Sequence, residues 1–174
     1  MKDFTAILAT ASAAIALSMS PGYSAAQGNG RTVAPSPIEG SWQVRITPYI
    51  CTTGQSLDAV AFDSMMTFGA NGTLVETTTN PAFQPGQRSP GHGSWERDWR
   101  PSIEAVFQAF VHFDTPLPAV PPHLPYKRGS QRAELAIELV DDDHWAGTLA
   151  VVFRTTAGAI ASNGCARTRA ARLL

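Results

Sequence analysis

The sequence has almost no excess of charge of either sign. Its 13 Lys and Arg residues against 14 Asp and Glu residues give a net charge of −1 at pH 7, and the isoelectric point is about 6.4. Proteins that bind nucleic acid electrostatically carry a basic patch or a strongly basic domain. The composition therefore argues against a nucleic-acid partner.

The sequence also lacks the short motifs that mark several enzyme classes. It contains no Gly-x-Ser-x-Gly nucleophile elbow, no phosphate-binding loop and no dinucleotide-binding fingerprint. His112, Asp114 and His123 lie near one another, but the prolines between them set no fixed ligand spacing. We expect neither a metal site nor a cofactor.

Long hydrophobic runs are scarce, and the clearest one is at the N-terminus. Lys2 precedes a stretch from Phe4 to Met19 that is almost wholly apolar or small, and Ser24-Ala25-Ala26 follows it. A charged start, an apolar run too short for a comfortable membrane span and small residues at the exit are typical of a secretory signal peptide. We expect residues 1–26 to be removed, leaving no stable membrane anchor.

The rest of the chain predicts one exported domain in the periplasm or outside the cell. Residues 27–37 contain Gly and Pro without periodicity, which is typical of a flexible tail. Residues 38–174 are enough for one hydrophobic core but not for two. The only cysteines are Cys51 and Cys165. In an exported chain a single pair favours a disulfide bond over two buried free thiols.

Apolar and polar residues alternate in eight short segments, as they do in half-buried β-strands. The segments are residues 40–48, 61–68, 73–79, 91–97, 103–113, 130–140, 144–154 and 159–171. Asn71-Gly72 is a strong signal for a tight turn, whereas prolines exclude regular structure from 80–90 and 114–126. Residues 103–113 also have fair helix propensity, but their odd-numbered positions are all apolar and their even-numbered positions are mixed, which favours a strand.

These segments predict an all-β fold, an eight-stranded antiparallel up-and-down β-barrel. Closure is the most economical arrangement of sequential antiparallel strands because it leaves no exposed edge. It also places the first strand beside the last. The proposed bond between Cys51 and Cys165 needs that neighbourhood, because the Cα atoms of a disulfide must lie within ~7 Å of each other.

Gly40-Ser41-Trp42 on the first strand, with arginines on the last, resembles the signature of lipocalins and the wider calycin group. The resemblance implies that Gly40 opens the strand and that Trp42 packs at the closed end of the barrel beneath an arginine from the final strand. Arg167 or Arg169 would be that arginine. The pattern over residues 38–172 is similar to that of small bacterial lipocalin-like proteins and of allene oxide cyclase-like barrels.

Candidate ligand contacts fall on the predicted inward faces and on one polar stretch. The apolar candidates either fill the barrel or line a pocket; they are Met66, Phe68, Trp95, Phe107, Val111, Phe113, Leu135 and Ile137. Arg88, His92 and Glu96 cluster near the predicted rim. His92 is a candidate general base, or an anchor with Arg88 for a carboxylate ligand, and Glu76 with Glu96 is a candidate acid–base pair. The plain alternative is a glycine-bracketed bulge with solvated polar residues.

Three functions fit this barrel. The leading hypothesis is that it binds a small apolar or amphipathic molecule; the second is a barrel-type cyclase or isomerase acting on a flexible apolar substrate, and the third is a structural barrel with a filled core. A cavity above ~300 Å³ would reject the third. Segments 103–113 and 144–154 are apolar on both parities, which predicts a homodimer that buries Val106, Phe110, Leu149 or Val151.

Overall fold

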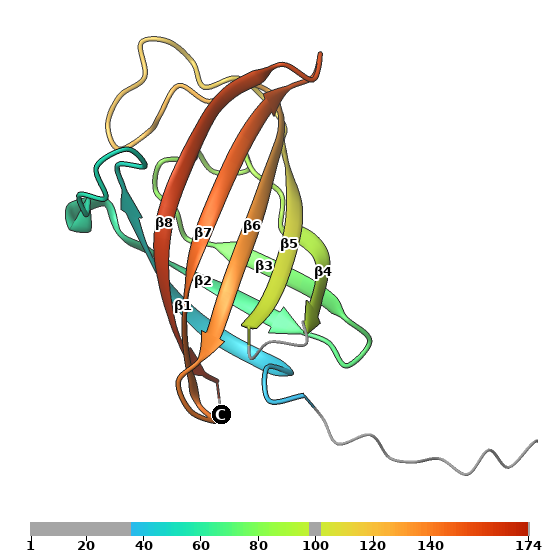
Figure 1. Ribbon diagram of the computed structural model, residues 1–174. Coiled ribbons are helices and arrows are strands. Elements are labelled where there is room, and N and C mark those ends of the chain that lie inside the picture. The colour runs from blue at the N-terminus through green and yellow to red at the C-terminus, as the bar shows by residue number, and fades with distance from the viewer. Residues whose placement is uncertain (1–35, 98–101, 174) are drawn as a thin grey trace, which may run out of the picture. The chain divides into compact units, whose positions relative to one another are not determined.

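The computed structural model describes residues 36–97 and 102–173, and the predicted signal peptide with nearly all of the predicted tail lies outside them. The described residues form a closed barrel in which each strand pairs antiparallel with its neighbours in sequence and the last pairs with the first (Figure 1). The strands are β1 (Gly40–Tyr49), β2 (Phe62–Phe68), β3 (Thr73–Thr78), β4 (Gly91–Arg97), β5 (Ser102–Val111), β6 (Gly129–Leu139), β7 (His144–Thr155) and β8 (Ile160–Arg172).

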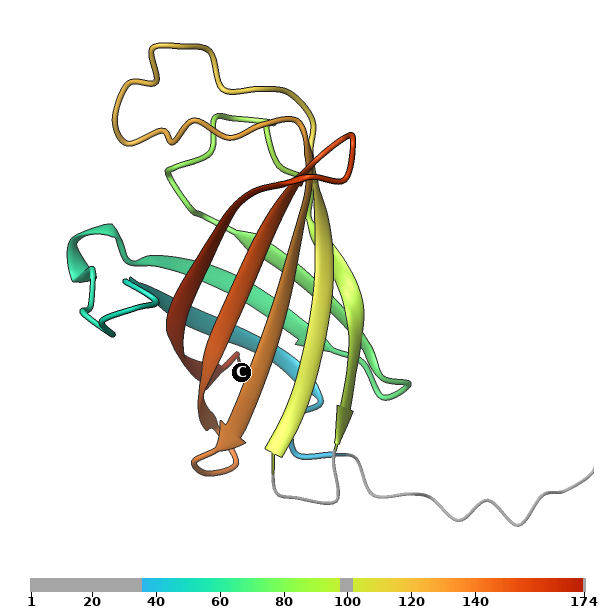
Figure 2. The same ribbon diagram turned by 45° about the horizontal axis from the view of Figure 1, so that its top comes forward.

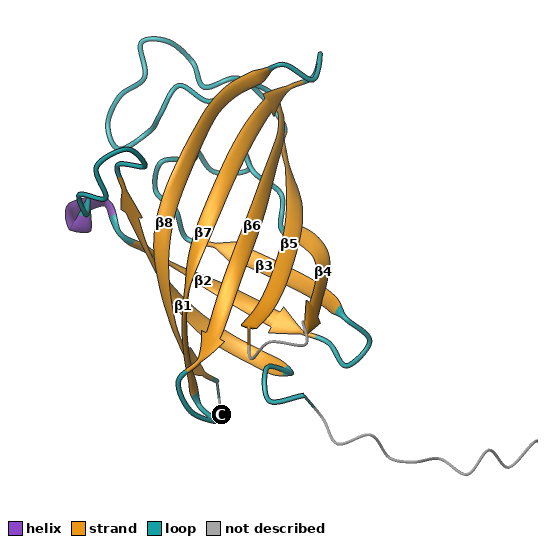
Figure 3. Cartoon of the chain, viewed as in Figure 1, coloured by secondary structure: helices purple, strands orange, loops and turns teal. Residues whose placement is uncertain are grey.

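The prediction of an eight-stranded up-and-down barrel is confirmed, and every strand end agrees with its predicted position within two residues. Outside the strands, the described residues are loops and one short 3-10 helix, η1 (Asp58–Val60) (Figure 3). The alternation in the sequence reports the two faces correctly on β1, where Trp42, Val44 and Ile46 are buried. No helix in the described part of the chain is long and apolar enough to cross a membrane.

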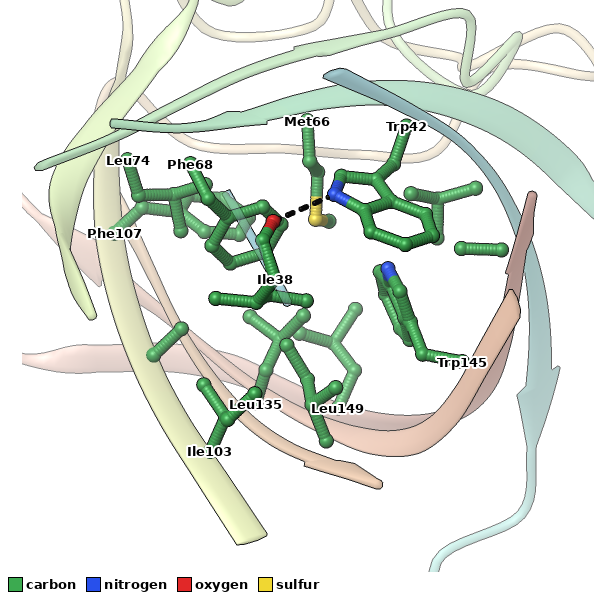
Figure 4. Packing of buried hydrophobic residues seen from close by; sticks show 14 of the residues in the cluster. Ile38, Trp42, Met66, Phe68, Leu74, Ile103, Phe107, Leu135, Trp145 and Leu149 are labelled. Carbon is green, nitrogen blue, oxygen red and sulfur yellow. Dashed lines mark hydrogen bonds between the residues drawn. The ribbon is translucent and has the colours of Figure 1, made fainter. Parts of the chain in front are cut away.

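One half of the barrel interior is filled by large apolar side chains. Trp42 and Trp145 are buried with their ring centroids 6.3 Å apart, and Phe68 packs edge-on against Trp145. The Nε1–H of Trp42 donates a 2.8 Å hydrogen bond to the carbonyl of Ile38 (Figure 4). This pairing satisfies a polar group that would otherwise be costly to bury. The packed aromatic side chains close the end of the barrel where β1 begins.

Arg172, and not Arg167 or Arg169, is the arginine that covers Trp42. Its guanidinium carbon lies 4.2 Å from the ring centroid, and Trp42 is directly opposite Arg172 in the β1–β8 register. The guanidinium also donates to the carbonyls of Glu39 and Asp142. Arg167 and Arg169 have the opposite parity and point out of the barrel. The prediction assigned this place to Arg167 or Arg169, but the even-numbered positions of β8 are the ones that face the interior.

Cys51 and Cys165 form the expected disulfide, with their Cα atoms 5.4 Å apart. Tyr49, the last residue of β1, lies opposite Cys165 on β8, so Cys51 comes just past the end of the pairing. The bond therefore fastens the loop after β1 to the outer side of β8. Free thiols, the alternative considered for this pair, are excluded by the bond.

Two long loops gather at the opposite, open end of the barrel: residues 79–90 between β3 and β4, and residues 112–128 between β5 and β6 (Figure 2). The fully buried Gln87 joins them. Its Nε2 donates to the carbonyl of Phe113 and to the hydroxyl of Thr115, and its Oε1 accepts from the backbone N–H of Gln84. This amide holds two proline-rich segments in place without regular structure.

The outer wall is less apolar than the sequence indicated. Leu149 is buried and Val151 packs against the core, because odd positions of β7 share the inward parity of Trp145. Their predicted place in a dimer interface is therefore wrong. On β5, Phe110 is 59% exposed and Val106 is partly exposed. The homodimer stays a prediction that depends on these two side chains.

Candidate ligand-binding site

The open half of the barrel contains a cavity of about 410 Å³. It is bounded by the ends of β1, β3 and β7, by the starts of β2, β6 and β8, and by the two long loops. Most of its lining is apolar; representative residues are Ile46, Phe62, Phe107, Leu149, Val151 and Ala166. Predominantly apolar walls with few polar groups are usual for small-molecule sites.

Aromatic rings from three separate segments make one side of the cavity. Phe83 of the first long loop stacks on Tyr126 of the second with ring centroids 4.3 Å apart, and Tyr126 lies 4.8 Å from Phe153 of β7. Burial raises the pKa of Tyr126 to about 12. Its hydroxyl therefore stays protonated and neutral near pH 7, where it can both donate and accept a hydrogen bond.

A polar cluster, made of Ser64, Glu76, Arg88 and Gln131, borders the cavity, and its last three members contribute polar groups to the lining. Arg88 and Glu76 form an ion pair at 2.7 Å, and their side chains are only 4% and 2% exposed. Ser64 donates a 2.6 Å hydrogen bond to the other carboxylate oxygen of Glu76. The Nε–H of Arg88 donates to the amide oxygen of Gln131. The cluster has no net charge, because the two ions compensate each other.

The guanidinium of Arg88 also lies against aromatic rings, 5.8 Å from the centroid of Phe83 and 6.0 Å from that of Phe107. The faces of aromatic rings attract a cation at such distances, so both rings stabilise the charge of Arg88. Arg88 thus connects the polar cluster to the aromatic side of the cavity. A bound molecule would meet both kinds of surface within a short distance.

Backbone features position these charged side chains. Arg88 lies in the loop between β3 and β4 but forms an isolated β-bridge with Val111 at the end of β5, which fixes its direction. Gly91 begins β4 immediately beside the cluster. A Cβ there would lie 2.6 Å from the Phe107 ring and 2.9 Å from a carboxylate oxygen of Glu76. Only glycine leaves room for both side chains.

The residues proposed from the sequence lie in four places: the cavity, the outer wall, the core and the rim. Arg88, Glu76 and Phe107 line the cavity. His92 and Glu96 are exposed on the outer wall of β4, since even positions there point outward. The other apolar candidates lie outside the cavity, and four of them are packed in the core: Met66, Phe68, Leu135 and Ile137. Val111 is buried on β5, Trp95 is partly buried against Phe68, and Phe113 is exposed at the rim.

Sequence reasoning missed Ser64, Gln131, Phe83, Tyr126 and Phe153. Gln131 had a usable signal, because it shares the parity of the buried residues Ala133 and Leu135 on β6. Phe83 and Tyr126 had none, since they belong to proline-rich loops without periodicity. Among the described residues, no group of three or more His, Cys, Asp or Glu side chains is placed to hold a metal ion.

No protein family matches the sequence, and neither does any curated protein. The barrel is similar to that of EF1p2_mFAP2b bound to DFHBI. The TM-score is 0.50 at 16% sequence identity, and the match covers 79% of this chain and 94% of the other. At this level of identity the similarity concerns the fold alone.

Proposed function

We propose that the protein binds a small amphipathic molecule in the cavity at the open end of the barrel. The observation that carries this proposal is an apolar cavity of about 410 Å³ whose polar lining centres on a buried, mutually neutralised ion pair. The volume exceeds the ~300 Å³ at which ligand sites begin, which argues against a wholly filled structural barrel. The structure of EF1p2_mFAP2b bound to DFHBI supports the idea that a barrel of this fold accommodates a ligand.

The lining favours a ligand with an apolar or aromatic body and an uncharged polar end. The body would lie against Phe83, Tyr126 and Phe153. The polar end would accept hydrogen bonds from Arg88, whose guanidinium has five N–H donors and uses only part of them within the protein. A carboxylate ligand would place a second negative charge beside Glu76, so a hydroxyl, carbonyl or amide suits the cluster better.

The cyclase or isomerase hypothesis has less support. It requires titratable groups that converge inside the cavity, yet His92 and Glu96 lie on the outer wall. Glu76 faces the cavity, but its two carboxylate oxygens already accept from Ser64 and Arg88. This engagement favours a structural and binding role for the carboxylate over proton transfer.

Export is part of the proposal. The disulfide between Cys51 and Cys165 supports an oxidising compartment, because such bonds are rare in reducing ones. The N-terminal sequence pattern adds independent support. Cell fractionation of the full-length chain tests this point, and recovery in the cytosol with an uncleaved N-terminus would contradict it.

Native mass spectrometry of the protein purified from its own source tests ligand binding. Gly164 of β8 lines the cavity, and a Cβ there would have no heavy atom within 4 Å. Gly164→Leu should therefore fill the cavity without a clash, while Ala171→Leu adds the same side chain on the exposed outer face. We expect a retained small molecule in the wild type and in Ala171→Leu, and its loss in Gly164→Leu.

The neutral dye 1-aminoanthracene provides a second readout that does not depend on the natural ligand. Its fluorescence should rise on binding to wild-type protein and to Ala171→Leu, and should rise much less with Gly164→Leu. Equal dye binding by all three proteins would place the binding elsewhere. A wild type that neither retains a molecule nor binds the dye at micromolar concentration would overturn the proposal.

A further inference from the structure

The outer wall of the barrel carries a hollow over β1 and β8 that is separate from the ligand cavity. It has a volume of about 260 Å³ and lies beneath the loop that follows Cys51. We call it the arginine cleft; its lining residues are Arg45, Thr47, Ser56, Asp58, Arg167 and Arg169. Three guanidinium groups and one carboxylate leave its lining with a net charge of +2.

The strand register concentrates this charge. Arg45 of β1 lies directly opposite Arg169 of β8, and like charges in directly opposed positions destabilise a sheet. Arg45 is partly compensated by Asp63 at 3.3 Å. No carboxylate of the described chain lies within 4 Å of the guanidinium of Arg167 or Arg169. Their cross-strand neighbours are Thr47, Arg45, Thr148 and Ala146.

The geometry points to a binding site for a phosphate monoester dianion in the arginine cleft. A guanidinium presents a planar fork of N–H donors that matches phosphate oxygens, and a phosphate monoester carries about −1.5 to −2 charges near pH 7. That charge complements the lining. The Thr47 hydroxyl adds a neutral donor on the same wall.

Two features preorganise the site. The Arg167 guanidinium is held 4.8 Å from the ring centroid of Tyr49 and makes only long, 3.4 Å contacts to the carbonyl of Gly54. Its donors therefore remain free for a stronger acceptor. The disulfide anchors the loop that carries Ser56 and Asp58 over the cleft, and Ser56 donates a 2.7 Å hydrogen bond to Asp58. This bond keeps both side chains at the edge of the cleft.

Calorimetric titration with inorganic phosphate at constant ionic strength tests the site. We expect saturable binding by the wild type and a dissociation constant raised about tenfold or more in Arg169→Gln, since a charge-assisted bond is removed. Arg132→Gln is the matched control, because Arg132 is also exposed but lies on β6 beside Glu134. It should bind phosphate within about twofold of the wild type.

Thermal unfolding separates binding from a structural role. Without phosphate, Arg169→Gln should unfold at the same temperature as the wild type or higher, because its repulsion from Arg45 is gone. Added phosphate should then stabilise the wild type and Arg132→Gln but not Arg169→Gln. A lower unfolding temperature for Arg169→Gln in phosphate-free buffer would contradict the proposal.

Co-sedimentation with phosphatidylcholine vesicles, with and without phosphatidic acid, distinguishes a free phosphate from one displayed on a lipid. Binding only to vesicles with phosphatidic acid, lost in Arg169→Gln, would assign the same cleft to a lipid phosphate. Binding of inorganic phosphate without vesicle binding would assign it to a soluble ester. If neither probe binds, or if both bind equally to all variants, the arginine cleft is not a phosphate site.

Discussion

Removing the charge of Glu76 should destabilise the barrel far more than removing an exposed carboxylate. Glu76→Gln keeps the size of the side chain but leaves Arg88, which is 4% exposed, without its counter-charge. Breaking a buried pair by removing one partner costs about 3–5 kcal/mol, and we expect the free energy of unfolding to fall by that amount. Glu134→Gln, at an exposed pair with Arg132 at 3.0 Å, should cost less than about 1 kcal/mol.

The reciprocal variant, Arg88→Met, should behave differently with pH. It leaves a buried carboxyl group, which can escape its charge by taking up a proton, whereas a buried guanidinium cannot lose one. The folded state of Arg88→Met then binds more protons than the unfolded state between pH 7 and 5, so its stability rises as the pH falls. The gain is at most about 1.4 kcal/mol per pH unit. The cost of Glu76→Gln should not change over this range.

Urea-induced unfolding followed by tryptophan fluorescence measures these differences, because Trp42 and Trp145 report on the core. Replacing both charges, with Glu76→Leu and Arg88→Met together, should restore most of the lost stability, since no unpaired charge remains. Losses below about 1 kcal/mol in both single variants would refute the inference that the pair is buried and essential. If the stabilities of Glu76→Gln and Arg88→Met depended equally on pH, the explanation that only the buried carboxyl group can neutralise its charge would be refuted.

Four further outcomes follow from the fold. Serine at both Cys51 and Cys165 should lower the free energy of unfolding by up to about 4–5 kcal/mol in chemical denaturation, because the bond closes a separation of 114 residues. Arg172→Gln should cost about 2 kcal/mol by calorimetry, since it uncovers Trp42 and leaves backbone carbonyls without charged donors. The difference in tyrosinate absorbance between the wild type and Tyr126→Phe should appear near pH 12, the pKa of Tyr126 in the folded protein. Because folding raises this pKa, the neutral Tyr126 hydroxyl contributes fully to the free energy of unfolding below pH 10, and this contribution is lost as the pH rises through 12. Sedimentation velocity should detect the homodimer expected from the exposed phenylalanine of β5, and a clean monomer at micromolar concentration would remove that prediction.

The barrel was predictable because period-two alternation records directly which side chains face the interior. The signal failed where a strand is apolar on both parities. On β7 the sequence alone did not show that Leu149 and Val151 share the inward face with Trp145. It was also not applied to β8, where the resemblance led to Arg167 or Arg169, which face outward, and not to Arg172.

The candidate site was less predictable, because much of it is built by loops. Phe83 and Tyr126 meet because the buried amide of Gln87 and a backbone hydrogen bond from Leu124 to Ala82 join their two segments, and such contacts leave no periodic trace in the sequence. Arg88 was identified from its local composition, but its partner Glu76 lies across the sheet. Placing the two together required the β3–β4 pairing and the bridge to β5.

A strand whose two faces line two different sites cannot shift its register by one residue without exchanging the side chains of those sites. On β8, Ala166 faces the cavity, while Arg167 and Arg169 face the arginine cleft, and a shift of one position would exchange them. Burial already favours this register, because a slip would turn Arg167 and Arg169 toward the mostly apolar cavity. The bond from Cys165 to Cys51 specifies it covalently. The disulfide thereby reinforces the division of the β8 side chains between the inside of the barrel and the outside.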